Sequence, residues 1–259
     1  MDDNANSDIV KSVAEVFPQT VKQADDALST VFGLFNTLML PFKMANLFAQ
    51  QKWEQFQEDM EHKTADIPAE NLQSPPLLIA GPTLEALKYA YDEVQLRDMY
   101  ENLLASAMDT RRVGRTHPAY VDTIKQMSPL DAQVLKKIVE THNRLRCVTI
   151  QFLIADTGVI YADGMPLYYV SELSDISDPF AISASLTNLK RLALIDIQIG
   201  TLLGANYEEL QRDEYVASRT RIYAEHCKKE LDKEMKVEIA ERYFVNINDY
   251  GKNFSAVCM

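Results

Sequence analysis

The stretch that decides the fold is residues 75–131, PPLLIAGPTLEALKYAYDEVQLRDMYENLLASAMDTRRVGRTHPAYVDTIKQMSPLD. Gly81-Pro82 interrupts the preceding chain, and Pro82 suits the first turn of a helix, where its missing N–H is not needed. The apolar residues that follow recur on one face at helical spacing: Leu84, Leu87 and Tyr91. We therefore predict an amphipathic helix that begins at Pro82.

A second amphipathic helix follows after only a few residues. Its apolar face consists of Leu96, Met99, Leu103 and Ala107, and its polar face of Arg97, Asp98, Glu101 and Asn102. Two helices with so short a connection are expected to pack as neighbours. The stretch closes on Ser128-Pro129-Leu130-Asp131, which combines an N-cap serine, a first-turn proline and an acid at the third position. A further helix is therefore predicted to start here.

The composition is that of a globular, mainly helical protein. Of the 259 residues, 47% are apolar and 25% are charged, and only eight are glycine. The net charge of −12 argues against a general binder of polyanions, because phosphate contacts need clustered lysine and arginine. Residues 109–146 differ from the rest, with eight basic and four acidic side chains. This basic segment is either a binding patch or, as we favour, pairs with the acidic remainder of the chain.

The three cysteines, Cys147, Cys227 and Cys258, are odd in number and widely separated. They form neither a disulfide framework nor a CxxC metal pair, which is typical of a reducing compartment. The N-terminal sequence MDDNANSD lacks the basic region of a secretion signal. We therefore expect a cytoplasmic protein.

Residues 1–74 are predicted to form a helical N-terminal arm, and its stretch from Ala27 to Phe42 carries no charge. One helical face there is apolar and the other is small and polar. The apolar face consists of Leu28, Val31, Phe35, Leu38 and Phe42. The run is shorter than the ~20 apolar residues of a membrane span and is interrupted by Pro41 and Lys43. We favour a packed helix or an oligomer interface. The alternatives are a helix lying on the inner face of the membrane and a spanning helix.

A central helical region at residues 75–127 leads into a winged-helix-like α+β domain at residues 128–259. A helix from Pro129 precedes a strand, and Asp178-Pro179 again pairs an N-cap with a first-turn proline. The strands are predicted at 147–154 and at LIDIQI (194–199), followed by a charged helix at 208–233, a hairpin at 235–247 and a short final helix. The predicted fold class is thus mainly α, with a helical arm, a central helical hairpin and a winged-helix-like C-terminal domain.

Six blocks of the sequence stand out: Gly81-Pro82 with EALKY (85–89), LRDMYENLLASAMD (96–109), HPAYV (117–121), IKQMSPLDA (124–132), NLKRLALI (188–195) and Gly251-Lys252-Asn253-Phe254. With these blocks the chain, from about Ala27 onward, resembles the abortive infection alpha (Abi-alpha) family of bacterial proteins. It departs from that pattern at Asn248-Asp249-Tyr250, where a Leu-Thr pair is expected, although Asp249 still suits a helix cap. The resemblance implies phage defence through growth arrest or death of the infected cell, and it implies no chemistry.

Arg112 and His117 are the sharpest catalytic candidates. Their spacing resembles the motif of HEPN-type ribonucleases, in which the histidine acts in acid–base chemistry and the arginine supports the phosphate. That motif belongs on a helix, whereas Gly114 and Pro118 predict a loop here. We therefore favour a structural role, in which His117-Pro118 orders the entry to the next helix. We expect no catalytic residue in this protein.

No metal or cofactor site is predicted. The histidines are His62, His117, His142 and His226, and none of them lies in an HxH or HExxH spacing. The sequence also lacks the GxxxxGK[ST] and GxGxxG patterns of nucleotide-binding loops.

A winged helix also suggests a DNA-binding interpretation. The reading helix would lie at residues 182–194, where Lys190 and Arg191 are the basic residues. The chain from Gln151 onward has 11 basic and 17 acidic residues, which is weak for docking in a DNA groove. We therefore favour a use of this domain in protein contacts or dimerisation.

Three functional hypotheses follow. The first is a non-enzymatic defence protein that engages a protein partner, a second copy or a membrane surface. The second is a winged-helix DNA-binding regulator, and the third is a HEPN-like ribonuclease that uses Arg112 and His117. We favour the first, with a homo-oligomer or another protein as the partner.

Overall fold

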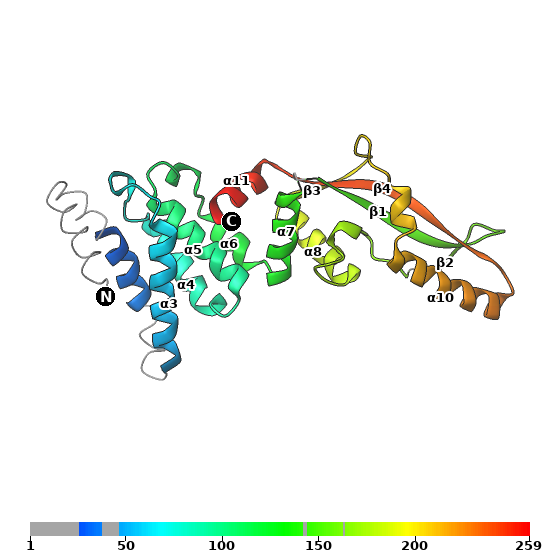
Figure 1. Cartoon of the computed structure of the whole chain (residues 1–259), viewed down its shortest axis with the longest axis horizontal. Helices are drawn as coiled ribbons and strands as arrows, with labels where there is room; N and C mark the ends of the chain where they lie inside the picture. Colours follow the sequence, from blue (N-terminus) through cyan, green and yellow to red (C-terminus); the bar gives the residue numbers. More distant parts are fainter. Residues whose placement is uncertain (1–25, 38–46, 142–143, 163) are drawn as a thin grey trace, which may run out of the picture. The chain divides into compact units, whose positions relative to one another are not determined.

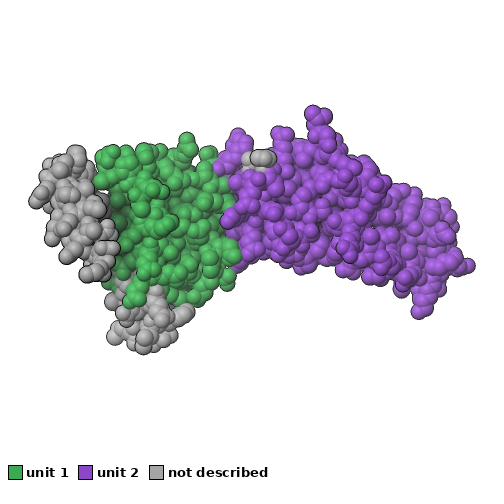
Figure 2. All heavy atoms as spheres, in the orientation of Figure 1, with its two compact units in different colours: residues 1–126, 253–259 green, residues 127–252 purple. Residues whose placement is uncertain are grey.

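The computed structural model describes residues 26–37, 47–141, 144–162 and 164–259. These residues form mostly helices, with a four-stranded antiparallel sheet in the C-terminal half of the chain (Figure 1). The mainly helical class with a C-terminal α+β region is thereby confirmed. The chain divides into two compact units (Figure 2), and the three segments expected from the sequence stay a prediction. Unit 1 consists of residues 1–126 and 253–259, and unit 2 of residues 127–252.

Unit 1 is built of helices around α5, which contacts α3, α4 and α6. Its elements are a helix at residues 26–37, α3 (Leu47–Thr64), α4 (Leu77–Ala90), α5 (Val94–Met108), α6 (Ala119–Lys125), the 3-10 turns η1 (Ala69–Asn71) and η2 (Val113–Arg115), and the C-terminal part of α11 (Asp249–Cys258). Helix α5 is buried on several sides, including its large side chains Tyr100, Leu103 and Leu104. The two adjacent helices predicted from the sequence are therefore confirmed as α4 and α5.

Helix α4 begins five residues before the predicted start, so Pro82 lies inside the helix rather than in its first turn. The preceding Pro75-Pro76 pair starts it instead, because the carbonyl of Pro76 accepts the N–H groups of Ile79 and Ala80, both at 2.9 Å. Pro82 is tolerated because it lies on the exposed side of the helix, where water can reach the carbonyl that loses its partner.

The end of α11 is held by polar side chains of α5 and of the loop that follows it. The last carbonyls of a helix have no partner within the helix and need donors from elsewhere. Ser106 Oγ donates to the carbonyl of Val257 at 2.9 Å, and Arg112 Nη2 donates to the carbonyl of Ala256 at 2.5 Å. The sequence block at residues 96–109 thus has a structural use, which is to fasten the C-terminus of the chain.

Unit 2 contains the sheet, in the order β2-β1-β4-β3 with all neighbours antiparallel. Its elements are α7 (Pro129–Glu140), β1 (Arg144–Ile154), β2 (Ile160–Ala162), η3 (Ser171–Leu173), α8 (Pro179–Arg191), β3 (Ile195–Ile199), α9 (Glu208–Gln211), α10 (Glu214–Leu231) and β4 (Met235–Ile247). The hairpin predicted at residues 235–247 is wrong, since these residues form the single strand β4. The segment contains no glycine or proline that would form a turn. Its side chains change from one alternating pattern to another because β4 has a bulge opposite Thr149 and Ile150 of β1.

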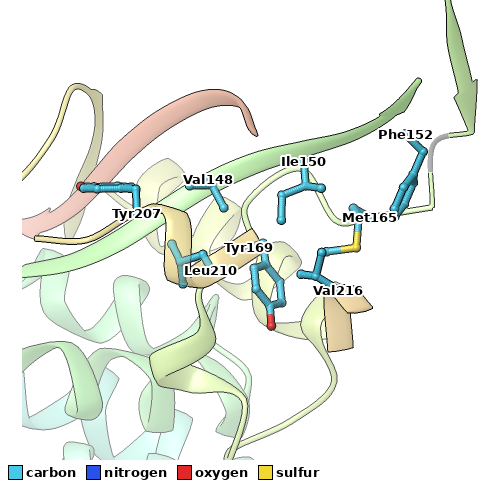
Figure 3. Close-up of a cluster of buried hydrophobic side chains, with 8 residues drawn as sticks. All are labelled: Val148, Ile150, Phe152, Met165, Tyr169, Tyr207, Leu210 and Val216. Carbon is cyan, nitrogen blue, oxygen red and sulfur yellow. The ribbon is translucent and has the colours of Figure 1, made fainter. Parts of the chain in front are cut away.

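One face of β1 carries the hydrophobic core of unit 2 (Figure 3). Val148, Ile150 and Phe152 alternate along the strand and therefore point to the same side of the sheet. Helices α9 and α10 and the segment before η3 cover this side with the other members of the cluster, which are Met165, Tyr169, Tyr207, Leu210 and Val216. Gly164 completes the packing, because a Cβ at that position would lie 2.1 Å from the ring of Tyr223.

The predicted helix start at Ser128 is confirmed. Ser128 and Asp131 form a reciprocal capping box at the N-terminus of α7. Asp131 Oδ2 also accepts a hydrogen bond from Asn188 Nδ2 of α8 at 3.0 Å. Asp178 caps α8 with its side chain alone, which accepts hydrogen bonds from the N–H groups of Phe180 and Ala181. Two of the sequence blocks, at residues 124–132 and 188–195, therefore meet through the bond from Asn188 to Asp131.

Candidate functional site

A cluster of charged side chains around the buried Glu101 is the most unusual chemical feature of unit 1 among the described residues. Asp59 of α3 and Glu101 of α5 flank the guanidinium of Arg97. Arg97 Nε lies 3.7 Å from Asp59 Oδ2 and 3.8 Å from Glu101 Oε1, distances that are too long for hydrogen bonds. Glu101 is only 2% exposed, and neither of these two carboxylate oxygens has a hydrogen-bond partner among the described residues.

Burial raises the pKa of Glu101 to about 8, and the negative charge of Asp59 acts in the same direction. Lys63 and Arg97 oppose this shift without cancelling it. Glu101 is therefore mostly protonated at neutral pH, and the cluster holds one proton that an exposed glutamate would release.

Aromatic and basic groups enclose the same cluster. The ring of Tyr91 lies 5.1 Å from the guanidinium carbon of Arg97, and its hydroxyl donates to the carbonyl of Lys52 at 2.7 Å. Lys63 Nζ contacts Asp98 and donates to Asn102 Oδ1 at 2.8 Å. The cluster thus joins α3 to α5, with Glu101 buried and Asp98 exposed at its edge. The carboxyl of Glu101 can hold a proton, and at 2% exposure it is too buried to act as a base on a substrate.

The sequence indicated the polar face of α5 but not this cluster. Arg97, Asp98 and Glu101 were expected on the face opposite the apolar residues, and such a face is ordinarily exposed. In the structure α3 covers that face and supplies Asp59 and Lys63. The opposite charges on the two helices are the signal that could have paired them.

Arg112 and His117 are placed in separate backbone-capping roles. Arg112 immediately precedes η2 and donates to the carbonyl of Ala256, whereas the Nδ1 atom of His117 accepts the N–H of Ala119 at 3.1 Å. Both side chains are exposed, and the segment between them is a 3-10 turn and an extended link rather than an α-helix. The arrangement differs from the single helix that a HEPN motif requires.

Several side chains of the basic segment form ion pairs within their own unit. In unit 1, Arg111 Nη2 lies 2.7 Å from Asp109 Oδ2, and the hydrogen bonds from Arg111 hold the pKa of Asp109 below its usual range. In unit 2, Lys137 pairs with Asp175 at 3.3 Å. Arg146 pairs there with Glu172 at 2.8 Å and with Glu209 at 3.2 Å. Lys137 and Arg146 thus pair with acids outside the segment, as we preferred, whereas Arg111 pairs with an acid of the segment itself.

Lys190 and Arg191 lie in the last turn of α8 and are exposed. Arg191 donates from Nε and Nη2 to Asn188 Oδ1 at 3.0 and 2.8 Å. Because Asn188 also bonds to Asp131, Arg191 extends the network that holds α7 against α8. The nucleic-acid role of these two residues stays a prediction.

The apolar face of the N-terminal arm packs, where it is described, within the chain itself. Val31 and Phe35 are fully buried, and Leu28 is half-buried. The ring of Phe35 stacks on Phe56 of α3, with ring centroids 4.2 Å apart. A membrane or second copy would contact Val31 and Phe35 only if this packing opened. The other two members of the face, Leu38 and Phe42, lie outside the described residues.

Two features are absent from the described residues. Within the described ranges no helix combines the length and the apolar character that are needed to cross a bilayer. In the same ranges no three His, Cys, Asp or Glu side chains gather in a group that could hold a metal ion.

Comparison with known proteins identifies one family. A family model described as abortive infection alpha matches residues 49–258. No curated protein matches the chain. A solved structure of an uncharacterised protein from the hydrocarbon-degrading marine bacterium Alcanivorax borkumensis SK2 is 12% identical, with a TM-score of 0.31. That match covers 57% of this chain and 94% of the other.

Proposed function

Because the chain belongs to the abortive infection alpha family, we propose that it is a phage-defence protein that acts through contacts with other proteins rather than through catalysis. The family match over residues 49–258 supports the defence role. The observation that supports contact over catalysis is the use of the polar side chains. Arg112 and His117 bind neighbouring groups of the chain itself, and Glu101 is only 2% exposed.

The topology of unit 2 supports a winged helix as the finer description of the C-terminal region. A winged helix places one helix before its first strand and two before its second, and the third strand pairs between the first two. Here α7 precedes β1, η3 and α8 precede β3, and β4 lies between β1 and β3. Helices α9 and α10 would then be an insertion in the wing. We propose that this module contacts protein, because the chain from Gln151 onward is net acidic.

The test is a phage challenge of bacteria that express the protein, with an empty vector as the control. We expect fewer infective centres with the protein, and growth arrest or death of infected cells. Total RNA should stay intact, and the double variant Arg112→Lys/His117→Gln should protect as well as the wild type. RNA cleavage that requires His117 would refute the contact mechanism in favour of a ribonuclease.

A membrane contact is the alternative that needs a separate measurement. Flotation of the purified chain with anionic liposomes would detect a protein at the inner membrane surface. We expect the protein to stay in the dense fraction, since Val31 and Phe35 are already buried. Flotation that is lost on removal of residues 27–49 would contradict a protein-only contact.

A further inference from the structure

Helices α3 and α5 are neighbours in unit 1 (Figure 1), and the charged side chains between them are odd in number. Two are basic, Lys63 and Arg97, and three are acidic, Asp59, Asp98 and Glu101. Lys63 pairs with Asp98 at 2.5 Å. Arg97 is left to face both Asp59 and Glu101. The charges therefore balance when Glu101 carries a proton, and one negative charge is in excess when it does not.

The excess charge would be buried and poorly paired. Glu101 is 2% exposed, and its Oε1 atom and Asp59 Oδ2 lie 3.8 and 3.7 Å from the same Nε atom of Arg97. Neither oxygen has a hydrogen-bond partner among the described residues. A buried charge without a hydrogen bond or a partner of its own is costly. Because Asp59 belongs to α3 and Glu101 to α5, separation of the two helices removes this cost by admitting water and moving the carboxylates apart.

The surroundings of Glu101 set the pH at which this charge appears. The charged groups that face it are Asp59 and Lys63 of α3 and Arg97 and Asp98 of α5. Burial, and then the charge of Asp59, raise the pKa of Glu101 to about 8. Tyr91, which follows α4, stays neutral because burial raises its pKa, and Asp122 of α6 acts on Tyr100 instead. Glu101 therefore changes its charge close to neutral pH.

The rest of unit 1 can keep its packing when α3 separates. Helices α4, α5 and α6 contact one another. The chain that follows α3 is fastened to the end of α5, because the N–H of Gln73 donates to the carbonyl of Met108 at 2.8 Å and the N–H of Thr110 donates to the carbonyl of Asn71 at 2.9 Å. Residues 65–70 lie between α3 and these bonds and can therefore serve as the hinge.

The N-terminal arm depends on α3 for its own burial. The ring centroid of Phe35 lies 4.2 Å from that of Phe56 on α3 and 6.4 Å from that of Tyr91. The arm cannot keep both contacts once α3 moves away from α5. Val31 and Phe35 are fully buried in the closed state. Opening therefore uncovers apolar side chains of the arm.

From the unbalanced charge, the missing hydrogen bonds and the connections of the helices, we infer that the α3–α5 interface is a pH-sensitive switch: the proton on Glu101 keeps α3 on α5, and its loss releases α3 and the arm. The closed state binds this proton more tightly than the open state, so closure is favoured at low pH and weakens as the pH rises to about 8. The inference names a regulation of the proposed contact function, and it rests on that function only for its biological use.

The test is native-state hydrogen exchange of the full chain between pH 6 and pH 9, with each rate divided by the intrinsic rate at that pH. Opening becomes about tenfold more favourable per pH unit up to about pH 8, so the protection of the α3 amides should fall about a hundredfold over this range. At pH 9 the α3 amides should be at least about tenfold less protected than those of α4 and α6. Their exchange should also respond less to low urea concentrations, since a local opening exposes little surface.

Two variants assign the effect to the charges at the interface. Glu101→Gln cannot ionise, so the protection of α3 should stay constant within about twofold from pH 6 to pH 9. Asp59→Asn leaves Arg97 to pair with Glu101 alone, which should lower the pKa of Glu101 and make the loss of protection smaller. Glu61→Gln, at an exposed position of α3, is the matched control and should behave like the wild type.

A wild-type α3 whose protection does not change with pH would overturn the inference. So would a Glu101→Gln variant that keeps the full pH dependence. Equal loss of protection in α3, α4 and α6, with the same response to urea, would replace the switch by unfolding of the whole unit. The phage assay is independent of these results: absence of phage protection with an intact switch would count against the proposed function and not against the switch.

Discussion

The substitution Glu101→Gln tests the buried proton of unit 1 most directly. Glutamine keeps the shape of a protonated glutamate and cannot ionise. The pKa of Glu101 is raised from its usual 4.5 to about 8 in the folded chain, so the folded state binds this proton more tightly than the unfolded state. The stability that the proton contributes is therefore fully present below about pH 4.5, and it is lost as the pH rises to about 8.

The magnitude follows from that span at about 1.4 kcal/mol per pH unit. It gives a total on the order of 5 kcal/mol, of which about 3 kcal/mol is lost between pH 5 and pH 8. Solvent does not screen this effect strongly, because Glu101 is only 2% exposed. The facing charges belong to Asp59 and Lys63 of α3 and to Arg97 and Asp98 of α5, and the substitution would leave all four in place.

The assay is urea unfolding of the wild type and of Glu101→Gln at several values between pH 5 and pH 8.5. Hydrogen exchange of the α5 amides assigns the transition to unit 1. We expect the variant to gain stability relative to the wild type by about 3 kcal/mol between pH 5 and pH 8. Glu61→Gln, at an exposed position of α3, should follow the wild type. A difference between Glu101→Gln and the wild type that stays constant with pH would refute the buried proton.

Three further predictions concern packing and backbone geometry. Gly251→Ala should destabilise unit 2 by about 3 kcal/mol or more in urea unfolding, because its Cβ would lie 1.9 Å from the carbonyl oxygen of Leu194. Ala193→Gly should raise stability by up to about 1 kcal/mol, since Ala193 follows α8 with a φ of 56°, and a lower midpoint would contradict this. The thiol of Cys147 should stay unreactive toward a thiol reagent until the chain unfolds, because it is buried and burial raises its pKa; labelling at native rates would be the opposite result.

Local signals predicted much of the fold. The capping box at Ser128 and Asp131 and the N-cap at Asp178 are both found, because these signals depend on residues only a few positions apart. The predicted strand LIDIQI is found as β3. The predicted helix start at Pro82 is wrong, because that prediction considered only the local effect of proline on the chain. A proline is compatible with a helix interior when its ring is exposed, and exposure is not a local property.

By itself the sequence determined the family, the mainly helical class, the N-caps and the apolar faces of α4 and α5. Only the tertiary structure decided what covers each face. It placed α3 over the polar face of α5 and thereby made a buried acid of Glu101, and it left Leu78 and Tyr89 of α4 exposed. The physical reason is that helix propensity and periodicity depend on neighbours along the chain, whereas burial and pKa depend on the residues that folding brings close.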